Sequence, residues 1–196
     1  METESLLQLH VGEFLDQLAG QNPTPGGGSA AALTGALAAA LGRMVAAFTL
    51  GKPKFAAVAP QVEALAARLQ RAEEMLRRLV DEDAAAYSVL DVAFKLDKAD
   101  AQRPARIAEA AGLAGSVPLE TATLAARVLD DLPQLRAIGN PLLCSDADAA
   151  RQLAYAAVQA AGANVRANLA LMTAEESKPI AAQLDALLAS QRPPVA

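Results

Sequence analysis

The segment Asn22-Pro23-Thr24-Pro25-Gly26-Gly27-Gly28-Ser29 contains two prolines followed by three consecutive glycines and leads directly into an Ala-rich run. Its prolines favour an extended approach, and its consecutive glycines remove every side chain from a turn. Three glycines in a row are costly to order, because glycine loses more backbone freedom on folding than any other residue. We therefore expect Gly26, Gly27, Gly28 and Ser29 to present backbone N–H groups to a ligand at a helix N-terminus. The alternative is a packing turn that lets two helices touch closely.

This segment does not match the common nucleotide-binding loops. It lacks a Gly-Lys-Ser or Gly-Lys-Thr ending, and no strand pattern precedes it. Both features belong to phosphate-binding loops, and a preceding strand belongs to dinucleotide fingerprints. The sequence therefore predicts neither of these two kinds of site.

Outside this segment, apolar residues recur at helical spacing, and no stretch shows sustained β alternation. We expect an all-α, single-domain bundle of about six to seven helices over residues 1–196. Proline and glycine predict a break at 115–118 and a separate short helix from Leu132-Pro133. Residues 191–196 are expected to fray as a Pro-rich tail. The expected helices cover about 6–18, 29–50, 55–95, 101–129, 132–138, 145–172 and 174–190.

Composition limits the functional classes. About a quarter of the chain is alanine and only 3% is aromatic, so each core side chain buries little area, and we expect a homodimer. A net charge of −5 argues against a nucleic-acid partner. The single cysteine, Cys144, and the single histidine, His10, exclude an intrachain disulfide, a Cys-cluster zinc site and a His-based metal cage. No metal is expected.

The sequence predicts no membrane segment. The uncharged stretch from Ser29 to Gly42 is 14 residues long and ends at Arg43, which is short for a membrane span and suits a buried helix. The N-terminus, Met1-Glu2-Thr3-Glu4, is acidic and lacks the apolar core of a secretory leader. We expect a cytoplasmic protein without a membrane partner.

Five segments in order resemble the cyclodeaminase/cyclohydrolase family, which comprises methenyltetrahydrofolate cyclohydrolases and the cyclodeaminase half of formiminotransferase-cyclodeaminases. The resemblance spans about residues 5–190 and implies a helical fold. It also implies folate as the substrate, with no cofactor beyond tetrahydrofolate. The segments are Pro23–Leu33, Phe48-Thr49-Leu50-Gly51-Lys52, Asp81-Glu82-Asp83-Ala84, Gly139-Asn140 with Ser145-Asp146-Ala147, and Asn164-Val165-Arg166-Ala167-Asn168-Leu169.

The resemblance implies chemistry on a one-carbon unit between N5 and N10 of tetrahydrofolate. A cyclohydrolase adds water to the methenyl carbon, whereas a cyclodeaminase closes the ring and releases ammonia. We place hydrolysis of 5,10-methenyltetrahydrofolate ahead of cyclodeamination, because no transferase domain precedes the glycine segment in this sequence. A folate- or anion-binding helical dimer without catalysis is the alternative from another class, and a purely structural helical dimer is a second one.

Either reaction needs a positioned acid or base, and the expected proton carriers are Asp83 and Asp146. Asp83 stands where an acidic cluster meets an apolar run, so burial can raise its pKa. Its alternative is a solvated helix face. Asp146 follows Ser145 at an expected helix start, where an ionised carboxylate caps the helix or contacts a cationic substrate.

The remaining candidates are expected to bind substrate. Asn164 and Asn168 are four residues apart on one helix face and suit a pterin edge, or else an inter-helix hydrogen bond. Lys52 and Lys54 suit the anionic glutamate tail, or else offset a helix dipole. The glycine segment completes the expected binding set with Thr24, Gly26, Gly27, Gly28 and Ser29.

The chain departs from the family pattern at a few positions. Phe48 stands where an Asn is expected, Pro53 interrupts a run of lysines, and Leu142-Leu143-Cys144 and Asp148 replace a more polar approach and a glycine. Such changes alter the pocket, the choice of substrate or the activity itself.

Overall fold

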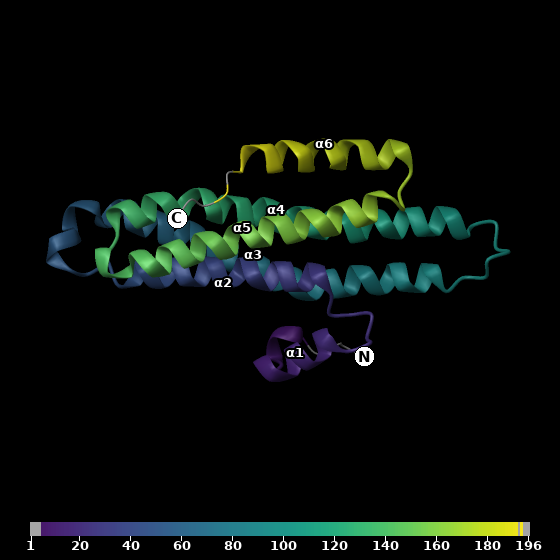
Figure 1. The fold of residues 1–196 in the computed structure, drawn as a ribbon, viewed down its shortest axis with the longest axis horizontal. Coiled ribbons are helices and arrows are strands. Elements are labelled where there is room, and N and C mark those ends of the chain that lie inside the picture. Colours follow the sequence, from purple (N-terminus) through teal and green to yellow (C-terminus); the bar gives the residue numbers. More distant parts are fainter. Residues whose placement is uncertain (1–4, 192, 194–196) are drawn as a thin grey trace.

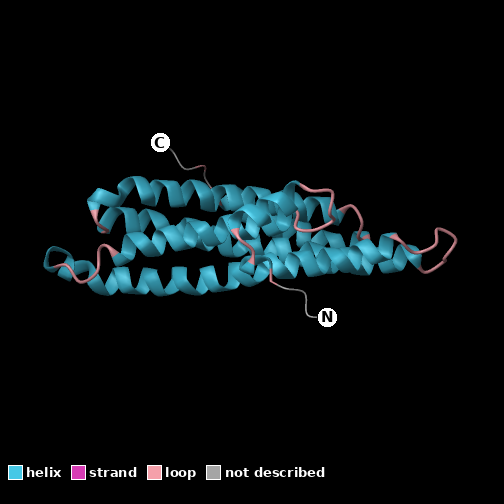
Figure 2. Cartoon of the chain, turned by 90° about the horizontal axis from the view of Figure 1, so that it is seen from below, coloured by secondary structure: helices cyan, strands magenta, loops and turns pink. Residues whose placement is uncertain are grey.

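The computed structural model describes residues 5–191 and 193. Within them, six α-helices and three short 3-10 helices make up the ordered elements, which confirms the all-α prediction (Figures 1 and 2). The expected tail, 191–196, lies outside the described residues except for Gln191 and Pro193. The elements are η1 (Leu6–Gln8), α1 (Val11–Ala19), α2 (Gly27–Ala47), η2 (Pro53–Val58), α3 (Ala59–Phe94), α4 (Arg103–Ile138), η3 (Pro141–Leu143), α5 (Cys144–Leu169) and α6 (Ala174–Ser190).

Four long helices, α2 to α5, lie side by side and enclose the main core (Figure 1). Helix α6 packs on α4 and α5, and the α3–α4 hairpin extends beyond the other helices (Figures 1 and 2). The core combines leucines of α3 and α4 with alanines of α2 and α5. Short alanine side chains therefore set the close spacing of the bundle.

Helix α2 depends on this spacing. A Cβ added to Gly42 would lie 2.8 Å from Leu132 Cδ2 and 3.0 Å from Leu69 Cδ1, so the glycine lets α2 approach both neighbours. In the described part of the chain, α2 is also the one helix long and apolar enough by composition to cross a membrane. Half of that apolar stretch is buried inside the bundle. Packing against α3, α4 and α5 therefore accounts for its composition.

The first expected helix, 6–18, is divided into η1 and α1. His10 adopts an extended backbone between them, and its N–H donates to Glu13 Oε2 at 2.8 Å. Asp81 of α3 holds η1 in place, because it accepts from Ser5 Oγ at 2.5 Å and from Leu6 N at 2.7 Å. The N-terminal segment is thus tied to the long helix that carries Asp83.

Two expectations about helix boundaries were wrong. Helix α4 runs without a break from Arg103 to Ile138, through both Pro118 and Pro133. A proline leaves the carbonyl four residues earlier without its helical donor, and at Pro118 that carbonyl, of Ala114, accepts from Asn168 Nδ2 at 3.0 Å. Packing and this side chain therefore preserve the helix. Helix α5 begins at Cys144 with Leu143 before it, so Asp146 lies in the first turn and does not cap it.

Candidate functional site

A cavity of about 190 Å³ lies where the N-terminus of α2 meets α3, α4 and α5. It brings together the glycine segment and one titratable carboxylate, that of Asp83. The lining residues are Pro23, Thr24, Gly26, Gly27, Gly28, Asp83, Tyr87, Ala114, Asn164 and Asn168. Seven of the predicted site residues therefore line this cavity. Ser29 does not line it but is hydrogen-bonded to Asp83, which does.

The carboxylate of Asp83 lies directly against the backbone of Gly28. A Cβ added to Gly28 would be 1.9 Å from Asp83 Oδ1, a separation that no side chain tolerates. Position 28 therefore requires glycine, because the Asp83 carboxylate occupies the space that a side chain would need. This close approach accounts for one of the three glycines by geometry.

Ser29 is fully buried beneath the same carboxylate. Its Oγ lies 3.0 Å from Asp83 Oδ2 and 2.9 Å from the carbonyl oxygen of Val80. A hydroxyl has one proton to donate. When Asp83 is ionised it accepts that proton, and when it is protonated it donates to Ser29 while Ser29 donates to Val80. The hydroxyl therefore has a hydrogen-bonded arrangement for each protonation state.

Burial raises the pKa of the Asp83 carboxyl above its ordinary value, and hydrogen bonds from the side chain and backbone of Ser29 partly oppose that rise. Desolvation disfavours the charged form, whereas donors directed at the carboxylate favour it. A carboxyl with a raised pKa is a stronger base than an ordinary one, and a larger fraction of it is protonated at a given pH. The cavity thus contains a group suited to acid–base chemistry.

The two asparagines of α5 lie across the cavity from Asp83. Asn164 is close to Gly27, where an added Cβ would be 3.0 Å from Nδ2. Asn164 Nδ2 donates to Ala160 O at 2.9 Å, and Asn168 Nδ2 donates to Asn164 O and Ala114 O, both at 3.0 Å. The inter-helix hydrogen bond considered for this pair is therefore made by Asn168 alone, whereas the bond that Asn164 donates stays within α5. The described residues provide no donor to either Oδ1 atom, which leaves both as acceptors for a ligand.

Asp146, Lys52 and Lys54 are not among the residues that line this cavity. Asp146 lies 18 residues before Asn164 on α5, or about 27 Å along the helix. The lysines follow the C-terminal end of α2, about 30 Å from Gly27. The two lysines lie in the connection between α2 and α3, at the end of the bundle opposite the α3–α4 hairpin (Figure 1). Their expected contact with substrate stays a prediction.

The lysine turn has interactions of its own. Lys52 Nζ lies 5.8 Å from the centre of the Phe48 ring, and Lys54 Nζ lies 4.7 Å from that of Phe55. Such distances are typical of cation–π contacts. Phe48, which departs from the family pattern, therefore serves as the partner of Lys52.

A buried hydrogen bond fastens this end of the bundle. Thr49 Oγ1 accepts from Asn140 N at 2.9 Å and donates to Val45 O at 2.8 Å. Two of the family segments, those around Thr49 and Asn140, are thereby joined to each other. They are about one helix length away from the cavity, so their joint role in this chain is to align α2 with the α4–α5 connection.

Sequence analysis missed three of the lining residues, Pro23, Tyr87 and Ala114. Tyr87 follows Asp83 by four residues on α3, and that spacing places both on one helix face. The spacing was a usable signal. Ala114 had none, because its place in the wall depends on how α4 packs against α5.

The fold and the cavity define an all-helical bundle protein with a partly buried acid beside a glycine-lined helix N-terminus. A family model described as formiminotransferase-cyclodeaminase matches residues 10–185. The chain belongs to this family, which confirms the resemblance seen in the sequence.

Individual relatives agree with this assignment. Methenyltetrahydrofolate cyclohydrolase from Methylorubrum extorquens is 36% identical over 159 residues, which cover 79% of this chain and 76% of that protein. Formimidoyltransferase-cyclodeaminase from Rattus norvegicus is 32% identical over 174 residues; the match covers 87% of this chain and about a third, 32%, of that longer protein. The crystal structure of formiminotetrahydrofolate cyclodeaminase from Thermotoga maritima matches this structure with a TM-score of 0.86 at 30% sequence identity. The match covers 94% of this chain and 90% of the cyclodeaminase chain.

Proposed function

We propose that this protein is a folate one-carbon enzyme that hydrolyses 5,10-methenyltetrahydrofolate to 10-formyltetrahydrofolate. The observation that carries the proposal is the partly buried Asp83 carboxylate, packed against Gly28 and hydrogen-bonded to Ser29 in a glycine-lined cavity. The 36% identity to a methenyltetrahydrofolate cyclohydrolase supports the choice of reaction.

In this mechanism Asp83 moves one proton. The ionised carboxylate first faces the cationic methenyl group, and it then takes a proton from the water that attacks the methenyl carbon. The resulting tetrahedral centre collapses as the bond from carbon to N5 breaks. Asp83 returns its proton to N5, and the hydroxyl proton leaves to solvent as the formyl carbonyl forms. Water and substrate thus give the product and one released proton.

Substrate binding in the proposal uses the other walls of the cavity. The backbone of Gly26 and Gly27 and the free Oδ1 atoms of Asn164 and Asn168 face the edge of a pterin ring, which offers both donors and acceptors. Thr24 completes this side of the cavity. The proposal needs no cofactor beyond the tetrahydrofolate substrate. It also includes a homodimeric state and a cytoplasmic location.

Cyclodeamination is the second candidate, and the structural match to a formiminotetrahydrofolate cyclodeaminase favours it. In that reaction N10 attacks the formimino carbon, and the leaving amine needs a proton in order to depart as ammonia. The same Asp83 carboxyl is placed to transfer it. The two candidates therefore differ in the substrate rather than in the proton carrier.

The decisive experiment follows the loss of 5,10-methenyltetrahydrofolate absorbance after addition of purified protein, with the spontaneous rate subtracted. We expect clear acceleration by the wild type and its loss in Asp83→Asn. Glu82→Gln is the matched control, because Glu82 is the exposed neighbouring acid and does not line the cavity. Absence of acceleration by the wild type overturns the proposal, and release of ammonia from formiminotetrahydrofolate would then establish the second candidate.

A further inference from the structure

Ser29 lies behind the cavity wall rather than in it. It is the third residue of α2, it is fully buried, and it is not among the residues that line the first cavity. Its hydroxyl oxygen lies 3.0 Å from Asp83 Oδ2, and Asp83 does line the cavity. Any influence of Ser29 on a ligand in the cavity therefore acts through Asp83.

Of the two groups that the Ser29 hydroxyl contacts, Asp83 depends on it more. The Val80 carbonyl lies inside α3, where the backbone N–H four residues later donates to it. That carbonyl keeps a partner whether or not the hydroxyl is present. The Asp83 carboxylate is partly buried, and a carboxylate that loses hydrogen bonds in such a place is costly to keep ionised.

Asp83 also takes the place of a capping side chain at the start of α2. The residue at the N-cap position is Gly26, which has no side chain that could accept from the first turn. The backbone N–H of Ser29 belongs to that turn and donates to the Asp83 carboxyl. Ser29 thus supplies both hydrogen bonds that oppose the effect of burial on the pKa of Asp83, and a change of its side chain removes only one of them.

The two oxygens of the Asp83 carboxyl have different surroundings. Oδ2 is the oxygen that lies 3.0 Å from the Ser29 hydroxyl. Oδ1 is the oxygen closer to Gly28, at 1.9 Å from an added Cβ compared with 2.7 Å for Oδ2. Because Gly28 lines the cavity and Ser29 does not, Oδ1 is the oxygen left to exchange a proton with a ligand.

We propose that Ser29 is a positioning residue whose hydroxyl holds Oδ2 of Asp83, so that Oδ1 exchanges the proton in the cavity. The hydroxyl donates to the ionised acid, and it turns toward the Val80 carbonyl when the acid is protonated and donates to it. The acid therefore has a partner in either state. The consequence for turnover rests on the proposed function, whereas the contact itself does not.

The other walls of the first cavity leave this role to Ser29. Among the described residues that line it, Asp83 is the one charged side chain, and Tyr87 of α3 is the other titratable group. Helix α5 contributes the neutral amides of Asn164 and Asn168, and α4 contributes Ala114. The protonation state of Asp83 is therefore governed by burial and by its contacts with Ser29.

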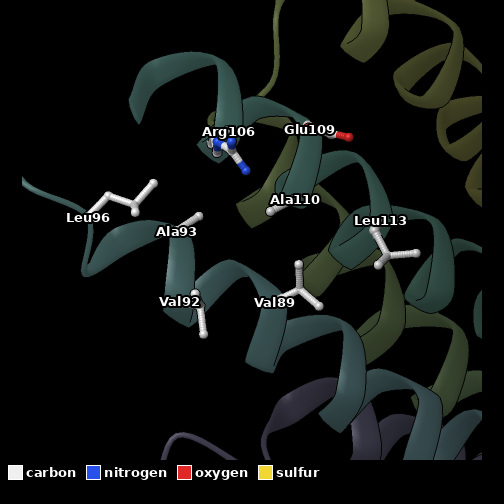
Figure 3. A pocket seen from close by; sticks show the side chains of 8 residues that line it. All are labelled: Val89, Val92, Ala93, Leu96, Arg106, Glu109, Ala110 and Leu113. Carbon is white, nitrogen blue, oxygen red and sulfur yellow. The ribbon is translucent and has the colours of Figure 1, made fainter. Parts of the chain in front are cut away.

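Charged groups elsewhere are directed to other places. Arg106 and Glu109 of α4 line a second cavity, of about 400 Å³, against the opposite face of α3 (Figure 3). The buried cluster around Leu90 lies between the two cavities. On α3 itself, Asp81 accepts hydrogen bonds from the N-terminal segment, and Glu82 is exposed.

The direct test follows the protonation of Asp83 by NMR. The carboxyl carbon of Asp83, in protein labelled with ¹³C-aspartate, is assigned by its absence in Asp83→Asn and is titrated in each variant. For Ser29→Ala we expect the midpoint to rise by about one to two pH units, because the ionised form loses a charge-assisted hydrogen bond. Ser29→Cys, whose thiol is a weak donor of similar size, should show a smaller rise.

Ser88→Ala is the matched control. Ser88 is an exposed serine of α3 outside the first cavity, and its hydroxyl donates to the Ala84 carbonyl at 2.8 Å. This variant also loses one hydroxyl that contacts a helix carbonyl, but that hydroxyl has no carboxylate partner. We expect its Asp83 midpoint and its hydrolysis to match those of the wild type.

The pH dependence of 5,10-methenyltetrahydrofolate hydrolysis gives a second measurement. In Ser29→Ala we expect the acidic limb of the profile to shift upward with the NMR midpoint. At pH values below both midpoints, kcat should fall by up to about tenfold per pH unit of the rise, because less of the acid is ionised. KM should stay within twofold of the wild type, since Ser29 does not line the cavity.

An unchanged Asp83 midpoint in Ser29→Ala overturns the inference, and so does a rise in KM with unchanged kcat, which would assign Ser29 to substrate binding. Circular dichroism checks that the variants fold, and if Ser29→Ala does not, the midpoint of Ser29→Cys decides in the same way. A raised midpoint supports the contact even if the wild type hydrolyses nothing, an outcome that overturns only the proposed function. Hydrolysis that is lost in Asp83→Asn but keeps its pH profile in Ser29→Ala overturns only the inference.

Discussion

At the scale of single residues, Asp83 links the proposed chemistry to stability. Its pKa is higher in the folded protein than in the unfolded chain, so the folded state binds more protons between the two values. The free energy of unfolding therefore falls as the pH rises from below the ordinary carboxyl value through the raised pKa. Above that pKa, the ionised acid destabilises the fold by a constant amount.

Replacing Asp83 should consequently separate activity from stability. Asp83→Asn keeps the shape and the contact with Ser29 but has no charge to desolvate, so we expect it to lose hydrolysis and to be more stable than wild type at neutral pH. Urea unfolding at several pH values measures this. The advantage should shrink as the pH falls below the raised pKa. A variant less stable than wild type at neutral pH would show that the carboxylate stabilises this site.

Gly28 offers a second test at this scale. In Gly28→Ala the new methyl carbon would lie only 1.9 Å from Asp83 Oδ1, so the carboxylate must move. We expect kcat/KM to fall by about a hundredfold or more, as for other small misplacements of a reacting group. Gly12→Ala is the control, because nothing lies within 4 Å of its added Cβ. Activity near that of wild type in Gly28→Ala would mean that the position of Asp83 is not critical.

At the scale of elements, α4 depends on a side chain of α5. The Asn168 amide replaces the donor that Pro118 removes from the Ala114 carbonyl. We expect Asn168→Ala to lower the free energy of unfolding by about 1–3 kcal/mol, because a buried carbonyl loses its partner. In a Pro118→Ala background the helix supplies its own N–H, so the same change should cost less. A double-mutant cycle by urea unfolding measures this coupling, and additive effects would contradict it.

The glycines of the helices differ in what surrounds them. An added Cβ at Gly112 of α4 meets nothing within 4 Å, so Gly112→Ala should raise the free energy of unfolding by up to about 1 kcal/mol through helix propensity. Gly42→Ala gains the same propensity but forces Leu132 and Leu69 to shift, and overpacking costs about 1–3 kcal/mol. Urea denaturation of both variants should therefore show shifts of opposite sign. Equal changes in the free energy of unfolding would indicate that Leu132 and Leu69 shift at no measurable cost.

Sequence periodicity predicted these helices well, since each buries an apolar face. It failed at Pro118 because the rescuing group, Asn168, is fifty residues further along the chain. In the candidate site, motif and glycine signals predicted Asp83, Gly28 and the asparagines, which line the cavity. The same signals grouped Asp146 and the lysines with them, because local sequence does not reveal which end of a long helix a motif occupies.

At the scale of the whole molecule, the proposed homodimer has a physical basis in the exposed apolar side chains. Val11 and Leu15 of α1 are 78% and 55% exposed, and Phe48 and Leu142 at the lysine end are 54% and 82% exposed. Burying such surface against a second copy is favourable. We expect sedimentation velocity at micromolar concentration to give about twice the chain mass of 20.1 kDa. A monomer across the accessible concentration range would contradict the dimer.

The walls of the first cavity also constrain how its specificity can evolve. Four of its lining residues, Gly26, Gly27, Gly28 and Ala114, have little or no side chain. Nearly every mutation at these positions adds atoms, so drift there narrows the cavity and seldom widens it. Tyr87 has the largest side chain among the lining residues, so its replacement by a smaller residue would enlarge the cavity most. Descendants of this protein should therefore acquire smaller ligands by many routes, and larger ones chiefly through that position.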